Sequence, residues 1–86
     1  MKHYQQKNLV SEKVGEETLI IDHEKGNLIT LNRTAGFIWD FIKQPKKQSQ
    51  IVIAYAKRFG KEKENDAREG LLNLVKAKVT RVTEEP

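Results

Sequence analysis

The chain of 86 residues has no cysteine, and its only histidines are His3 and His23. The lack of cysteine excludes disulfide bridges and thiolate metal sites. No apolar run approaches the about 18 residues of a membrane span, and the N-terminal MKHYQQKNLV has no hydrophobic signal segment. A chain this short builds one modest core, so a deep enclosed active site is not expected. These absences predict one cytoplasmic domain over residues 1–86, without membrane contact.

Charge is only slightly unbalanced, since sixteen Lys and Arg oppose twelve Asp and Glu for a formal net charge of +4. An excess of this size favours an acidic partner weakly and does not indicate nucleic acid. Apolar residues recur regularly between Leu19 and Val79, which is incompatible with disorder throughout. We expect loose ends and an ordered core over about residues 7–79.

Short stretches rich in branched side chains predict three antiparallel strands near residues 9–14, 18–23 and 27–31, with Gly26 in the second turn. In LITLNRTAGFIWDFI the apolar period then changes to that of a helix over about 33–43. Asn32 or Thr34 would cap this helix, and Trp39 would enter the core.

Two further helices are expected, one from Ser49 to Phe59 and one over about 64–78, in which Gly70 is a weak point. The C-terminal VTRVTEEP is compatible with either a strand or a tail. The predicted fold class is α+β and winged-helix-like, with a three-stranded antiparallel sheet followed by three helices.

No constellation of residues indicates catalysis or metal binding. Asp22, His23 and Glu24 are adjacent on a strand and turn, where neighbours point to opposite faces, so a solvated cluster is the better interpretation. His3 is expected in a mobile terminus, and Asp40 on the surface. We predict that the protein is not an enzyme and holds no cofactor or metal.

The third helix has an unusually wide apolar arc made of two neighbouring stripes. The stripes are Leu72, Val75 and Val79, and Ala67, Leu71, Leu74 and Lys78. Either the domain packs around this helix on two sides, or one stripe packs while the other receives a ligand. An open sheet edge beside such a helix favours a peptide that adds itself as a strand.

The segment LIIDHEKGNLITLNRTAGFIWDFI resembles the PqqD-like family, the precursor peptide recognition elements of ribosomally synthesised and modified peptides. The motif positions in this sequence are Asp22, Gly26, Leu31, Asn32, Thr34, Ala35, Ile38 and Trp39. The similarity continues through AKRFG and the third helix, and covers about residues 19–79.

The resemblance implies a non-catalytic adaptor that binds the leader segment of a precursor peptide with its third strand and third helix. The implied leader-binding residues are Asn27, Leu28, Ile29, Thr30, Leu31, Ala67, Arg68, Leu71, Leu74, Val75 and Lys78. Leu71, Leu74 and Val75 would line a groove, and Arg68 and Lys78 would hold acidic leader residues. On this hypothesis Leu74→Asp abolishes binding and leaves the fold intact.

The implied partners are the precursor leader peptide and the modifying enzymes of its pathway. A lasso peptide pathway, with a leader peptidase and an ATP-dependent cyclase, is preferred. The alternatives are a PqqD-type chaperone in quinone cofactor synthesis, a winged-helix DNA-binding regulator, and a structural subunit that pairs with a second copy through its sheet edge. DNA reading is disfavoured because the third helix begins with Glu62, Glu64, Asp66 and Glu69, which would face phosphate with like charge.

Overall fold

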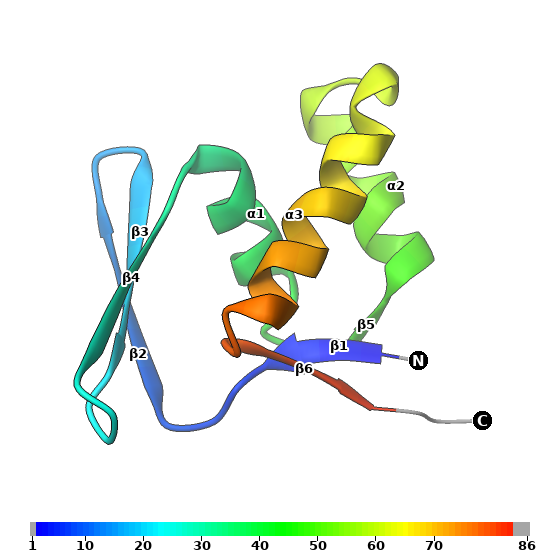
Figure 1. Ribbon diagram of the computed structural model, residues 1–86. Helices are drawn as coiled ribbons and strands as arrows, with labels where there is room; N and C mark the ends of the chain where they lie inside the picture. Colours follow the sequence, from blue (N-terminus) through cyan, green and yellow to red (C-terminus); the bar gives the residue numbers. More distant parts are fainter. Residues whose placement is uncertain (1, 84–86) are drawn as a thin grey trace.

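A computed structural model describes residues 2–83, which form two small antiparallel sheets and three α-helices (Figure 1). The elements in chain order are β1 (Lys2–Gln5), β2 (Leu9–Val14), β3 (Glu17–Asp22), β4 (Asn27–Leu31), α1 (Arg33–Phe41), β5 (Lys46–Lys47), α2 (Gln48–Phe59), the 3₁₀ turn η1 (Lys61–Lys63), α3 (Glu64–Lys76) and β6 (Thr80–Thr83). The predicted α+β fold, with a three-stranded sheet and three helices, is confirmed.

The first sheet is the predicted meander, with the order β2-β3-β4. In its register Ile20 lies between Ser11 and Ile29, and Ile20 is fully buried. Gly26 takes a φ of +70°, as the β3–β4 turn requires. Asp22 closes this turn, because its Oδ1 accepts hydrogen bonds from the backbone N–H groups of Glu24 and Lys25 at 3.1 and 3.2 Å. Asp22 therefore has a structural role here.

Helix α1 begins directly after β4 because Asn32 caps it. The Asn32 Oδ1 accepts the Ala35 N–H at 2.9 Å and the Thr34 hydroxyl at 3.1 Å. Of the two predicted caps, Asn32 is thus the one used. Ile38 and Trp39 are 0 and 1% exposed, which confirms the expected core position of Trp39.

The second sheet has the order β5-β1-β6 and joins the two ends of the described chain. His3 pairs with Lys46 on one side and Val82 on the other. The expectation that His3 is mobile is wrong, because it lies in β1 and is only 7% exposed. The ambiguous C-terminal segment is a strand from Thr80 to Thr83, and residues 84–86 lie outside the described residues.

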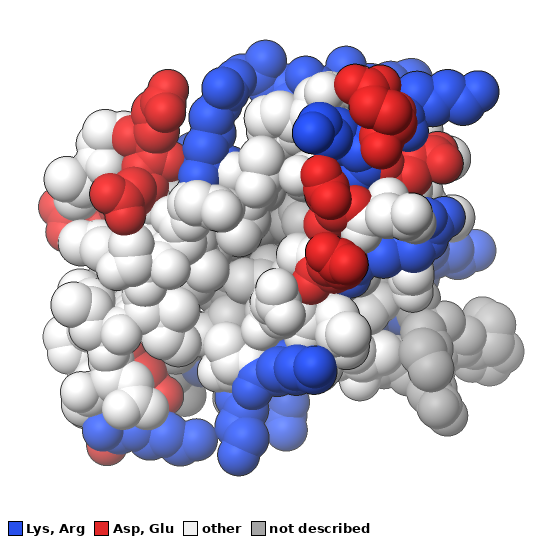
Figure 2. Space-filling model, turned by 45° about the horizontal axis from the view of Figure 1, so that its top comes forward, with Lys and Arg blue, Asp and Glu red and all other residues white. Residues whose placement is uncertain are grey.

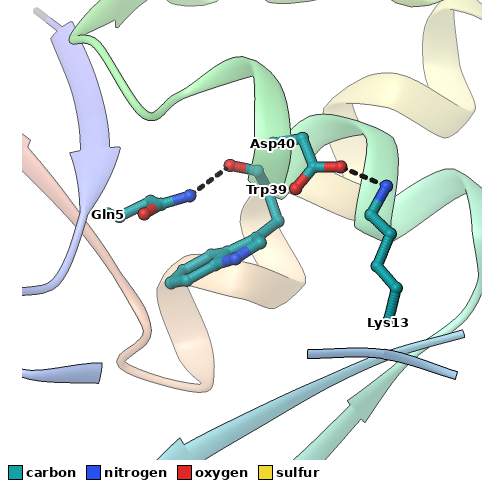
Figure 3. Close-up of polar contacts among 4 residues, drawn as sticks. All are labelled: Gln5, Lys13, Trp39 and Asp40. Atoms are coloured by element: carbon teal, nitrogen blue, oxygen red, sulfur yellow. Dashed lines mark hydrogen bonds and ion pairs between the residues drawn. The ribbon is translucent and has the colours of Figure 1, made fainter. Parts of the chain in front are cut away.

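Helix α1 is tied to both sheets by polar side chains (Figure 3). The Gln5 Nε2 of β1 donates to the Trp39 carbonyl oxygen at 2.7 Å, near the end of α1 where helical carbonyls lack partners. Lys13 of β2 pairs with Asp40 at 2.5 Å between Nζ and Oδ2. Asp40, expected on the surface, is half-buried and carries this ion pair.

The core lies where α1 meets the first sheet, α2 and α3. Its largest fully buried side chains are Trp39, Ile20, Ile38, Ile42, Ile51 and Leu74. An aromatic cluster joins α1 to α2, with Phe37 edge-on to Phe59 at 5.4 Å between ring centroids. Gly36 faces β3 so closely that a Cβ there would lie 2.7 Å from the Thr18 Oγ1.

This contact gives a first prediction. Alanine normally stabilises a helix interior over glycine by about 1 kcal/mol. At Gly36 we expect the reverse, a loss of about 1 to 3 kcal/mol in the free energy of unfolding, because the new methyl group overpacks against Thr18. Urea denaturation measures the loss, and Thr18→Ala in the same chain should restore most of it. A Gly36→Ala variant more stable than the parent would contradict the close packing of α1 on β3.

A second prediction concerns pH. Burial lowers the pKa of His3 below its ordinary value of 6.5, and its Nδ1 has no hydrogen-bond partner among the described residues. The unfolded chain therefore binds the proton more readily, so the stability due to neutral His3 is complete above pH 6.5 and is lost as the pH falls toward the lowered folded pKa. The free energy of unfolding should decrease as the pH falls from about 7 to 5. In this range the protonation of carboxylates contributes least to the pH dependence.

His3→Gln should flatten this pH dependence, as measured by urea denaturation at each pH. His23→Gln is the matched control, because His23 lies in an exposed turn. Equal slopes for the parent and His3→Gln would show that His3 does not supply the effect.

Candidate functional site

A groove of about 570 Å³ runs between the β4–α1 junction and α3, and we call it the β4–α3 groove. One side is formed by Leu31 of β4 and Ala35 of α1. The other side is formed by Gly70, Asn73 and Ala77 of α3. Figure 2 shows an uncharged hollow on this face, with acidic side chains along one border. The groove is open and mainly apolar, as an extended ligand would need.

The outer edge of β4 borders this groove and is unpaired, because β4 pairs with β3 alone among the strands of residues 2–83. Its side chains alternate. Leu31 is 7% exposed and Ile29 packs on the core, whereas Leu28 is 63% exposed on the outer face. The edge therefore offers free backbone N–H and C=O groups beside an apolar groove. The outer edge of β2 is also unpaired in this sheet, but β2 is exposed along nearly its whole length.

Gly70 lines the groove at the place where α3 packs against α1. A Cβ at this position would lie 3.1 Å from the Ile38 Cδ1 of α1, so the missing side chain lets α3 approach α1 closely. Gly70 weakens the helix by propensity, as the sequence indicates. Close packing against Ile38 explains why a glycine occupies this position in spite of its low helix propensity.

The leader-binding residues expected on α3 do not form one surface. Ala67, Leu71 and Leu74 are 0, 3 and 1% exposed, so they belong to the core. Only Leu74 of this set lines the β4–α3 groove, from its floor. Of the predicted groove residues Leu71, Leu74 and Val75, the first two are therefore buried in the core.

Arg68, Leu71 and Val75 line a different groove of about 560 Å³, which we call the second groove. It lies on the other side of α3 and includes the exposed residues Leu72 and Val82. Arg68 and Val75 are about half a helical turn away from Gly70 and Asn73 around the axis, so the two grooves occupy opposite faces of α3. The structure does not bring Arg68, Leu71 or Val75 together with β4.

Lys78 follows the end of α3 and takes a left-handed φ of +64°. It is exposed and lines neither groove. The site residues predicted from the sequence did not include Gly70, Asn73 and Ala77, which form the α3 side of the β4–α3 groove. Their small or polar side chains recur on one helical face, and a search for apolar stripes passes over such residues.

No group of three or more His, Asp or Glu side chains within residues 2–83 is placed to hold a metal ion. None of the described helices has the length and apolar character to cross a membrane.

An unpaired strand edge beside an apolar helix groove is the arrangement with which folded domains bind extended peptides. Comparison with known families agrees with this class of fold. The family described as "Coenzyme PQQ synthesis protein D (PqqD)" matches residues 17–79, so the chain belongs to the PqqD family. No curated protein matches the sequence.

One solved structure shares the fold over nearly the whole length of both chains. It is described as "TbiB1 in Complex with the TbiA(beta) Leader Peptide", and its TM-score with this chain is 0.76 at 19% sequence identity. The match covers 95% of this chain and 99% of the other. At this identity the likeness establishes a common fold.

Burial reverses the outcome expected for Leu74→Asp. A carboxylate placed at the 1%-exposed Leu74 loses its hydration in the core, so we expect a loss above about 4 kcal/mol and an unfolded protein. Leu72→Asp is the matched control, because Leu72 is on the same helix and 52% exposed. It should change the free energy of unfolding by less than about 1 kcal/mol. Circular dichroism and urea denaturation measure both, and a folded Leu74→Asp variant would contradict the core assignment.

Proposed function

We propose that this protein binds the leader segment of a ribosomally synthesised precursor peptide as an additional strand on the outer edge of β4. The observation that carries the proposal is the unpaired β4 edge beside the β4–α3 groove. Main-chain hydrogen bonds fix the register of the leader, and its alternate side chains enter the groove. Membership of the PqqD family and the common fold with a leader-bound protein support this mode of binding.

The energy of such a complex must come mainly from a few apolar anchors. A dissociation constant between micromolar and nanomolar corresponds to about 8 to 12 kcal/mol. Exposed ion pairs contribute only about 0.2 to 1 kcal/mol each. Leader side chains that cover Leu31, Ala35 and Ala77 would supply most of the affinity, because these residues form apolar parts of the groove lining.

The protein would act as a non-catalytic adaptor that delivers the bound peptide to modifying enzymes. We propose a lasso peptide pathway, with a leader peptidase and an ATP-dependent cyclase as partners. The alternative is a quinone cofactor pathway, which the description of the matched family favours. Identification of the precursor decides between them.

A DNA-binding role has weaker physical support. The first turn of α3 carries Glu64 and Asp66, and Asp66 and Glu69 line the β4–α3 groove. These carboxylates would repel phosphate if α3 entered the major groove. A bound peptide needs no such approach to a polyanion.

Calorimetric titration tests the function directly, with the leader of the precursor encoded beside the gene as the probe. We expect saturable binding at micromolar or tighter affinity that weakens little from low to high salt. Because counterion release makes DNA binding fall steeply with salt, the same measurement with duplex DNA separates the two functions. No peptide binding, together with steeply salt-dependent DNA binding, would overturn the proposal.

The two grooves of α3 provide a matched pair of variants. Asn73→Trp places a large ring in the β4–α3 groove, where Asn73 is exposed, and should weaken leader binding about tenfold or more. Arg68→Trp places the same ring in the second groove and should leave affinity unchanged. Circular dichroism checks that both variants fold. Loss of binding in Arg68→Trp alone would place the leader in the second groove, with the helix residues that the family resemblance implies.

A further inference from the structure

The net charge of the residues that line the β4–α3 groove is opposite in sign to the net charge of the whole protein. The lining includes three charged residues, Lys63, Asp66 and Glu69. The Lys63 Nζ lies 3.8 Å from the Asp66 Oδ2, so these two largely compensate each other. Glu69 has no ion-pair partner within residues 2–83. A chain with a formal net charge of +4 thus presents a groove with one uncompensated negative charge.

Glu69 stands on the same face of α3 as the groove wall. Asn73 follows it by one turn and Ala77 by two turns, so the three residues form one row along the groove. In Figure 2 acidic side chains border the hollow on one side. A ligand that lies along the row therefore meets small and polar side chains at one end and a carboxylate at the other.

The spacing of this row converts into a spacing along an extended peptide. Ala77, the C-cap of α3, lies eight positions after Glu69, which is about 12 Å along the helix axis at 1.5 Å per residue. A strand covers that distance in about four residues at 3.3 Å per residue. Side chains four residues apart on a strand point to the same face. One ligand strand can thus place one side chain at Ala77 and another at Glu69.

We propose that the β4–α3 groove selects leader peptides with a Lys or Arg about four residues from the apolar residue that covers Ala77. This inference rests on the proposed function and names the chemistry of its substrate. Glu69 is the specificity-determining residue, since it attracts the basic side chain and penalises an acidic one at the same place.

This assignment reverses the charge that the sequence predicted for the leader. The predicted contacts were Arg68 and Lys78 with acidic leader residues. Arg68 lies in the second groove, where its guanidinium donates to the Asn65 Oδ1 at 3.2 Å. Lys78 lines neither groove. The uncompensated charge in the lining of the β4–α3 groove is that of Glu69.

A display library of random 12-residue peptides, selected on the full-length protein, tests the inference without knowledge of the natural precursor. Wild-type protein should enrich peptides with alternating apolar residues and a Lys or Arg at a fixed offset. Selection on Glu69→Lys should replace that basic residue with Asp or Glu. Glu64→Lys is the matched control, because it makes the same change of charge on α3 outside this groove and should keep the wild-type preference.

One enriched peptide and its Lys→Glu variant then give the size of the effect by calorimetry. The exchange should weaken binding to wild type about fivefold to tenfold and should strengthen binding to Glu69→Lys. The difference should shrink at high salt, since the pair is exposed.

The outcomes separate this inference from the function on which it rests. Enriched peptides without a basic position, or with a basic position that Glu69→Lys retains, would overturn the charge selection and leave peptide binding standing. Failure to enrich any peptide, with wild type confirmed as folded by circular dichroism, would overturn both.

Discussion

The arrangement of the whole domain depends on how closely α1 packs against its neighbours. A helix of nine residues contacts the first sheet, the second sheet and both other helices. Its close approach to β3 depends on Gly36, which has no side chain toward Thr18. From this position Ile38 reaches Gly70 of α3 and the Trp39 carbonyl accepts the Gln5 amide. Since the chain is too short for a large core, these contacts around one buried helix replace the layered packing of bigger domains.

The same packing creates the groove. Because α1 fills the space between the first sheet and α3, these two elements stand apart, and the β4 edge is left without a neighbour. A covered edge would bind nothing, and a fully exposed one would invite aggregation. The β4 edge lies between these extremes, since Leu31 is anchored in the core while Leu28 remains in solvent. The negative net charge of the residues that line the groove further favours a peptide over a polyanion.

Local sequence patterns predicted the elements that depend on local physics. The meander follows from branched residues and Gly26, and the helices follow from their apolar period and from Asn32. The second sheet was not predictable in this way, because β1 and β6 pair across nearly the whole chain and β5 is two lysines long. On α3 the period revealed a wide apolar arc but not which neighbour each part of it faces. In the structure Leu72 is exposed. Of the predicted groove residues, Leu74 lies with Gly70 and Asn73 in the β4–α3 groove, whereas Leu71 and Val75 line the second groove.

The second sheet also determines how this domain can be joined to others. Lys2 lies opposite Thr83 in the β1–β6 pair, so the described chain begins and ends at adjacent positions, away from the meander and the β4 edge (Figure 1). A larger polypeptide attached at either position would extend from the same end of the domain and leave the β4–α3 groove accessible. Tethering of an enzyme there would raise the effective concentration of its bound substrate without any new contact between the two domains. The fold is thus suited to work equally as a separate protein or as a covalently attached recognition unit.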